Sequence, residues 1–197
     1  TDANSDGTYE VDVMATLGNT GSTASERSIE LGSVNTWQSV SITITDATAP
    51  TVQSVSSSTA DGTYKAGDVI NINVLFSEAV TVNTTGGTPQ LTLETGSTDQ
   101  TVSYSSGSGT NTLAFSYTVQ NGDTSADLNY KATSSLALNG ATIRDAAGNN
   151  ATLTLPALAS SDSLAGNSAL VIDGSAPTIA VSSDVSSLRA GETASLT

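Results

Sequence analysis

The chain has 197 residues, lacks cysteine and histidine, and carries 19 acidic against 5 basic side chains, for a formal net charge of −14. The lack of cysteine excludes a disulfide framework, and the lack of histidine excludes a Ser-His-Asp triad and most zinc sites. The acidic balance argues against nucleic acid and anionic membrane surfaces as partners, because phosphate binding needs a basic surface. A cation is the natural partner for such a chain.

Composition also limits the fold class. Aromatic residues make up 4% and charged residues 12% of the chain, and much of the rest is serine, threonine, glycine and valine. These residues are poor helix formers and are common in strands and turns. The sequence therefore predicts an all-β protein, and no apolar run approaches the roughly 20 residues that cross a bilayer.

The first 45 residues predict three short strands, over residues 9–15, 28–31 and 40–45. Three strands cannot close a core of their own. We therefore interpret residues 1–45 as the C-terminal part of a preceding domain, and the chain as an excerpt of a longer protein.

A repeated motif divides the rest of the chain. Asp46-Ala47-Thr48-Ala49-Pro50-Thr51 follows one predicted strand, and Asp173-Gly174-Ser175-Ala176-Pro177-Thr178 follows another. A motif that recurs after equivalent strands marks repeated domain starts. We expect a complete domain over residues 46–172 and the start of a following domain over residues 173–197.

The complete domain is organised around Val69–Val82. Ile70, Ile72, Val74 and Phe76 alternate with polar neighbours, which predicts a strand with one buried face. Glu78 follows where this strand is expected to leave the core.

Other predicted strands surround this one, and residues 156–167 form a polar stretch that fits no element. The strands are expected over residues 51–56, 89–94, 101–104, 113–119, one or two within 128–143, one at Leu153 and Leu155, and 170–172. The region 60–68 is predicted as a loop. Seven or more short strands separated by turns indicate a β-sandwich.

Several motifs together resemble the tandem bacterial Ig-like repeats of very large secreted adhesins. They are Ala66-Gly67-Asp68, Leu75–Val80, Pro89–Leu93, Leu113–Val119, Leu138–Ile143, Asp145-Ala146-Ala147-Gly148-Asn149 and the Asp-x-x-Ala-Pro junction. The resemblance covers nearly all of residues 46–178. It implies all-β, Ig-like β-sandwich repeats in tandem, a location outside the cell or on its surface, and a non-enzymatic module that often carries calcium. Residues 1–45 lack a clear Asp-Ala-Ala-Gly-Asn loop and depart from the pattern.

Strand alternation in such a sandwich brings distant acids to one end of the domain. Asp46, Glu78 and Asp145 are expected to meet there, with Asn149 as a fourth oxygen donor and Asp2 and Asp6 reaching across from the preceding domain. Calcium takes six to eight oxygen ligands in tolerant geometry, whereas magnesium demands a stricter octahedron. We therefore predict a Ca2+ site at this domain junction.

A second calcium site is predicted at the opposite end of the domain. Its candidate ligands are Asp61, Asp68, Asp123, Asp127 and Asp173. The alternative is that these acids only form turns, because Asp and Asn side chains accept hydrogen bonds from nearby backbone amides.

The sequence-based hypothesis is a calcium-stiffened structural spacer of a bacterial extracellular adhesin, extending a distal binding region from the cell in adhesion or biofilm formation. Its partners would be calcium ions, the neighbouring repeats and, through other regions, a host or surface ligand. Two alternatives remain: an Ig-like ligand-binding module for a glycan or a protein, or a spacer in a large secreted enzyme. The module itself is not expected to be an enzyme, because few aromatic residues are available to hold a sugar beside a carboxylate pair.

Overall fold

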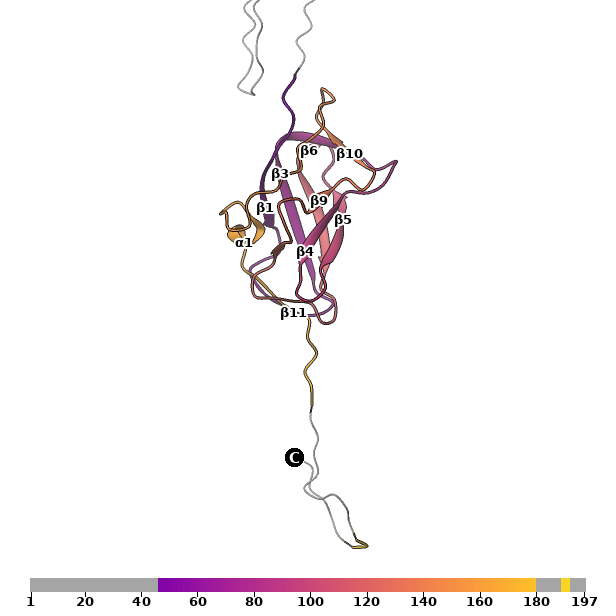
Figure 1. Cartoon of the computed structure of the whole chain (residues 1–197), viewed down its shortest axis with the longest axis vertical. Coiled ribbons are helices and arrows are strands. Elements are labelled where there is room, and N and C mark those ends of the chain that lie inside the picture. Colours follow the sequence, from indigo (N-terminus) through magenta and orange to yellow (C-terminus); the bar gives the residue numbers. More distant parts are fainter. Residues whose placement is uncertain (1–45, 180–188, 192–197) are drawn as a thin grey trace, which may run out of the picture.

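The computed structural model describes residues 46–179 and 189–191. The predicted strands before Asp46, with Asp2 and Asp6, lie outside the described residues, as does most of the predicted following domain. The described body is elongated and rich in strands (Figure 1), and the chain arrives at one end and leaves at the other. We call these ends the N-terminal pole, at residues 46–50, and the C-terminal pole, at residues 174–179.

Eleven strands and one short helix make up the described body. They are β1 (Val52–Ser57), β2 (Gly62–Tyr64), β3 (Val69–Asn83), β4 (Gln90–Glu94), β5 (Gln100–Ser106), β6 (Thr110–Thr118), β7 (Thr124–Ser125), β8 (Asn129–Tyr130), β9 (Leu136–Ala137), β10 (Thr142–Arg144), α1 (Leu164–Asn167) and β11 (Leu170–Asp173). The prediction of an all-β fold is confirmed.

The predicted central strand is confirmed as β3. Its four alternating apolar side chains, Ile70, Ile72, Val74 and Phe76, are all fully buried. The strand runs past Glu78, where it was expected to leave the core, and continues to Asn83. The reason is β10, which pairs antiparallel with the last residues of β3 and supplies hydrogen bonds for a longer strand.

The strands form one curled sheet and one small sheet. The larger sheet has the order β1-β3-β6-β5-β4-β8, with β10 beside β3 and β9 beside β4, and its pairs are antiparallel. The smaller sheet has the order β2-β11-β7, and β2 runs parallel to β11. The region 60–68, predicted as a loop, therefore contains a strand, because β11 offers β2 a partner that local sequence cannot reveal.

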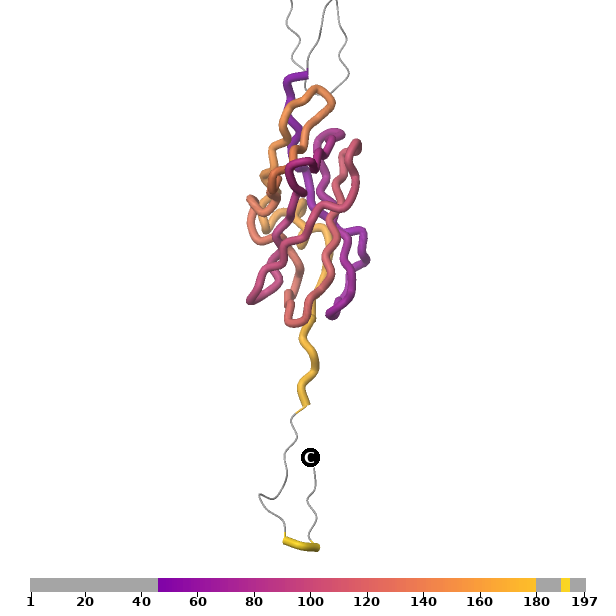
Figure 2. Tube along the Cα trace, turned by 90° about the vertical axis from the view of Figure 1, so that its right-hand side faces the viewer, coloured from indigo at the N-terminus to yellow at the C-terminus, as the bar shows by residue number. Residues whose placement is uncertain are grey.

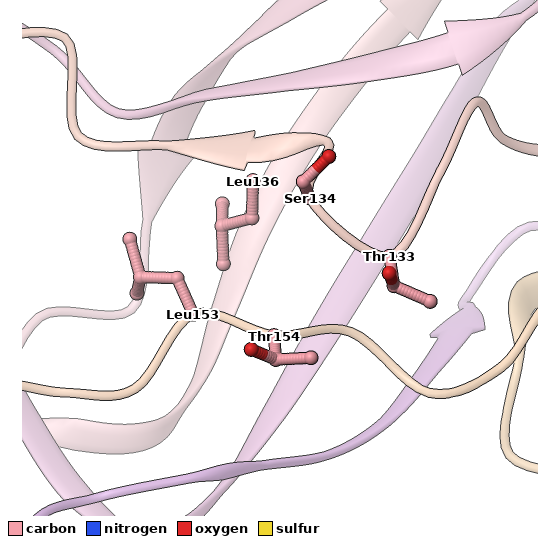
Figure 3. Close-up of a pocket in the computed structure, with 5 residues that line it drawn as sticks. All are labelled: Thr133, Ser134, Leu136, Leu153 and Thr154. Carbon is pink, nitrogen blue, oxygen red and sulfur yellow. The ribbon is translucent and has the colours of Figure 1, made fainter.

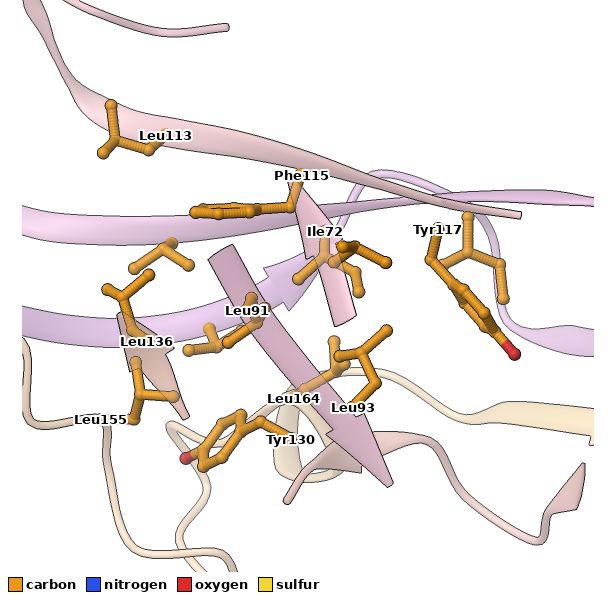
Figure 4. Close-up of a cluster of buried hydrophobic side chains, with 14 of the residues drawn as sticks. Ile72, Leu91, Leu93, Leu113, Phe115, Tyr117, Tyr130, Leu136, Leu155 and Leu164 are labelled. Atoms are coloured by element: carbon orange, nitrogen blue, oxygen red, sulfur yellow. The ribbon is translucent and has the colours of Figure 1, made fainter. Parts of the chain in front are cut away.

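The curled sheet encloses one apolar core (Figure 4). Side chains from β3, β4 and β6 meet there, and Tyr104 packs edge-on against Phe115 with ring centroids 6.2 Å apart. The largest fully buried side chains are Tyr117, Tyr130, Phe76, Phe115, Ile70, Ile72, Leu91, Leu93, Leu113, Leu128, Ile143 and Leu164.

Residues 156–167, the polar stretch that fitted no predicted element, cover the outer edge of β1. Val55 donates its amide hydrogen to the carbonyl of Asp162 and accepts a hydrogen bond from the Asn167 side chain. Leu164 of α1 is fully buried in the core. A covered edge cannot pair with another chain, so this segment protects the sheet from edge-to-edge association.

The strand predicted at Leu153 and Leu155 is wrong. Within residues 151–156, only Thr152 forms a bridge, a single parallel pair with Thr51. Leu155 is buried, but its amide donates to the carbonyl of Thr133 in a loop, so the segment has no continuous strand partner.

Candidate metal centre

Three carboxylates meet at the N-terminal pole. One oxygen atom each from Asp46, Glu78 and Asp145 lies within 4.8 Å of the others. Asp145 is buried, and Asp46 and Glu78 are partly buried. They come from the arriving segment, from β3 and from the loop after β10, so the fold brings together three residues that are distant in the sequence. Figure 2 shows the arriving segment, in indigo, beside the orange loop that follows β10.

An irregularity in β3 places Glu78. The pairing of β3 with β6 is regular to Leu75 and shifts before it resumes at Val80. Extra residues in one strand bend it and re-aim its side chains. Ser77 adds a direct tie to the arriving chain, because its amide donates to the carbonyl of Thr51 and its hydroxyl accepts from the Thr51 amide.

A tight loop places Asp145. The Asp145 carboxylate accepts hydrogen bonds from the Asn149 amide at 2.8 Å and from the Asn149 side chain at 2.7 Å. The backbone closes the same loop, since Gly148 donates to the carbonyl of Asp145. Asp145 thus both shapes this turn and belongs to the three-carboxylate group.

Asn149 ties the arriving segment to this loop. Its side-chain nitrogen donates to the carbonyl of Asp46 at 3.0 Å and to the carbonyl of Thr48 at 3.2 Å. The sequence predicted an oxygen ligand at this position. In the structure the Asn149 side-chain nitrogen contributes N–H groups that hold Asp46 near Glu78 and Asp145, and the oxygen-ligand role stays a prediction.

The electrostatics of the group oppose full ionisation. Loss of solvation raises the pKa of Glu78, and the negative charges of Asp145 and Asp46 raise it further. Burial also raises the pKa of Asp145, but hydrogen bonds from Asn149, Gly148 and Ala147 outweigh this and leave the pKa below its ordinary value. An opposite charge nearby would favour all three ionised forms. The group could hold a metal ion through anionic oxygens.

Each acid predicted for the second site bonds to a different partner, and these acids do not form a group with metal-binding spacing. Asp61 accepts from the amide of Ala169, Asp173 accepts from the amide of Ser175, and Asp123 is buried among three hydrogen-bond donors. Asp68 pairs with the Lys65 ammonium group at 2.9 Å. Hydrogen bonds from the side chain and the amide of Lys65 lower the pKa of Asp68. Asp127 accepts from the amide of Leu170. Over residues 46–179 and 189–191, the three carboxylates of the N-terminal pole are the one group with metal-binding spacing.

A shallow pocket is lined by none of these acids. Figure 3 shows its five lining residues, contributed by the turn before β9, by β9 itself and by the segment beyond Thr152: Thr133, Ser134, Leu136, Leu153 and Thr154. None of the five carries a titratable side chain, so the lining offers hydroxyl groups and leucine surface but no acid-base pair.

Sequence reasoning found the three carboxylates and named Asn149 as an oxygen donor, but it missed the positioning role of Asn149 and of Ser77. Both residues act through contacts across more than one element, and Asn149 does so through the backbone carbonyls of Asp46 and Thr48. The one available signal was the Asp-x-x-x-Asn spacing of Asp145 and Asn149, which is also the spacing of an ordinary turn.

Comparisons with protein-family models, with curated proteins and with solved structures find no match for this chain. Within the described residues, no helix has the length and apolar character that crossing a membrane requires.

Proposed function

We propose that the domain is a calcium-stiffened structural spacer of a bacterial extracellular adhesin, built as one of a series of Ig-like β-sandwich repeats. The observation that carries this proposal is the meeting of three carboxylates at the N-terminal pole, one of which belongs to the arriving chain. A cation bound there would tie that chain to the body of the domain.

Calcium suits the group better than magnesium or zinc. Its three anionic oxygens come from one buried and two partly buried side chains, and calcium accepts variable geometry with further carbonyl and water ligands. Zinc prefers nitrogen and sulfur ligands, which this group lacks. Extracellular modules bind calcium with dissociation constants of roughly 10⁻⁴–10⁻³ M, so a millimolar environment would load such a site.

The mechanical consequence follows from the position of Asp46. Without a cation, three close carboxylates repel one another and favour release of the arriving segment. With a cation, Asp46 is held against Glu78 and Asp145, and the direction in which the chain reaches the domain becomes fixed. A string of domains with fixed junctions would extend a distal binding region away from the cell.

The second junction motif supports the proposal that the domain is one of a series of repeats. Asp46 accepts a hydrogen bond from the amide of Thr48 at 2.9 Å, and Asp173 accepts one from the amide of Ser175 at 3.3 Å. Both junctions thus begin with the same side-chain-to-backbone turn. By this equivalence, Asp173 would serve a following domain as Asp46 serves this one.

The test is calcium-dependent unfolding of the complete chain with magnesium as the comparison. Binding at 100 times the dissociation constant adds about 2.7 kcal/mol to the free energy of unfolding. We expect the calcium-specific rise in Tm to be roughly 5–10 °C. The double variant Glu78→Gln/Asp145→Asn should abolish it. Asp61→Asn/Asp127→Asn, which removes the same charge from two acids outside the three-carboxylate group, should retain it.

Small-angle scattering then tests the spacer role. Calcium should narrow the distribution of shapes and increase the maximum dimension of the wild-type chain, and the Glu78→Gln/Asp145→Asn variant should not respond. If calcium leaves both Tm and scattering unchanged, the proposal fails. Glycan or protein capture by the chain in the absence of any calcium effect would then favour the ligand-binding module.

A further inference from the structure

The segment that leaves the domain is held by the body after β11 has ended. Gly174 is buried, and both of its backbone hydrogen-bonding groups are used. Its amide donates to the carbonyl of Asp123 at 2.8 Å, and its carbonyl accepts from the amide of Gly122 at 3.0 Å. The antiparallel pairing of β7 with β11 thus continues beyond Asp173 onto the turn that joins β6 to β7.

Gly174 approaches this turn more closely than a larger residue could. A Cβ atom at position 174 would lie 2.3 Å from the carbonyl oxygen of Gln120 and 2.9 Å from that of Asp123. Its φ angle is not in the left-handed region, so steric contact alone would resist a larger residue here. The equivalent position of the first junction motif is Ala47, which is exposed.

The buried Asp123 carboxylate holds the turn in shape. It accepts hydrogen bonds from the Tyr117 hydroxyl at 2.7 Å, the Gln120 amide at 2.9 Å and the Gln100 side chain at 2.9 Å. Asp123 is 3% exposed, and each of its donors is neutral. These contacts connect β5, β6 and the turn, so the carbonyl that receives the Gly174 amide is fixed to the body.

We infer that the C-terminal pole fixes the outgoing chain at Gly174 without any cation, through a latch made of Gly174 and the turn Gln120–Asp123, with Asp123 as its positioning residue. Bending of the outgoing chain then begins after Gly174, within Ser175–Pro177. The latch is independent of the proposed calcium site, which lies at the opposite pole. A domain junction would accordingly have one side that is fixed permanently and one side that calcium fixes.

Amide exchange measured by NMR on the complete chain in EDTA tests the latch. We expect the amides of Gly122 and Gly174 to exchange at least about tenfold more slowly than unstructured amides, because both are hydrogen-bonded in the folded state. Backbone order should fall after Gly174. Calcium should leave the protection of both amides unchanged, and so should the Glu78→Gln/Asp145→Asn variant, so failure of the calcium site would not imitate failure of the latch.

Two variants test which contacts protect the amides of Gly122 and Gly174. Asp123→Asn places an N–H group among three donors, and Gly174→Ala introduces the steric contact without touching the carboxylate. Each should remove protection at Gly122 and Gly174 while the amides of β3 and β6 stay protected. Asp127→Asn makes the same change of charge in an exposed neighbouring position and should have no such effect.

Three results would overturn the inference. They are unprotected Gly122 and Gly174 amides in wild-type chain without calcium, protection that appears only when calcium is added, and full protection of both amides in Gly174→Ala. If Asp123→Asn unfolds the whole domain, Gly174→Ala decides the question alone.

Discussion

At the scale of single residues, the N-terminal pole depends on an asparagine that acts as a donor. Asn149 donates to the carbonyls of Asp46 and Thr48 and to the carboxylate of Asp145. Replacing it with an acid would turn three attractive contacts into repulsive ones and would add a fourth carboxylate. Asn149 thus stabilises the pole when no cation is bound, and changing it to an acid would alter cation binding and cation-free stability in opposite directions.

We predict that Asn149→Asp lowers the free energy of unfolding in EDTA by about 1–3 kcal/mol, because partly buried acceptors lose their donor and face a negative charge. The same variant should gain more stability from calcium than the wild type does, because its site is more negative. Urea denaturation with and without calcium measures both effects. The control is Asn150→Asp, since Asn150 accepts a hydrogen bond from Arg144 and an aspartate can still accept it.

The raised pKa of Glu78 predicts a pH dependence. The folded, cation-free chain binds the Glu78 proton more tightly than the ordinary value of 4.5 implies, so ionisation of Glu78 costs stability as pH rises through its raised pKa. The lowered pKa of Asp145 acts in the opposite sense, and the stability it contributes is lost as pH falls through that lowered value.

Glu78→Gln should therefore stabilise the chain in EDTA at pH 7 and have little effect near pH 4, where Glu78 is itself protonated. The gain should stay below about 1 kcal/mol, because the side chain is partly solvated. With calcium present at pH 7 the order should reverse, and the wild type should be more stable than the variant. Thermal unfolding at the two pH values checks this, and an unchanged order with calcium would contradict a ligand role for Glu78.

At the scale of elements, the segment 156–168 both caps β1 and completes the core. Leu164 of α1 is fully buried, whereas Leu158 in the same segment is 44% exposed. Leu164→Ala should lower the free energy of unfolding by about 2–5 kcal/mol, as for other large-to-small core changes. Leu158→Ala should change it by no more than about 0.5 kcal/mol. Equal effects in chemical denaturation would show that the segment does not contribute to the core.

Leu164→Ala should also expose the edge of β1. With α1 displaced, the amide and carbonyl of Val55 would lose their partners in Asp162 and Asn167 and become available to another chain. We expect Leu164→Ala to form oligomers at concentrations where Leu158→Ala stays monomeric. Size-exclusion chromatography coupled to light scattering distinguishes the two.

The sequence predicted the long strand and the carboxylate group but not the short elements. β3 was predictable because its alternation is long and strict, and the meeting of Glu78, Asp145 and Asp46 followed once strands were assumed to alternate in direction. β2 and α1 were not predictable, because three or four residues carry no periodic signal. Nor could the sequence show that Asp123 is buried, since its donors Tyr117 and Gln100 lie on different strands and meet it only through tertiary packing.

At the scale of the whole molecule, the described body has its two chain ends at opposite poles (Figure 1). This arrangement is what a series of domains joined end to end requires. The two poles are built on different principles. The N-terminal pole gathers carboxylates around the arriving chain, and the C-terminal pole grips the departing chain with backbone hydrogen bonds.

The parallel pairing of β2 with β11 determines how such a body would respond to tension. Leu170, Val171 and Ile172 pair with Gly62, Thr63 and Tyr64, close to the departing end of the chain. A pull on the two chain ends draws β2 toward one pole and β11 toward the other, so the hydrogen bonds between them are loaded in shear and must rupture together. In single-molecule force spectroscopy, the domain should unfold at higher force when pulled by its ends than when pulled from Asn121 and the C-terminus, a geometry that peels β11 from β7 one bond at a time.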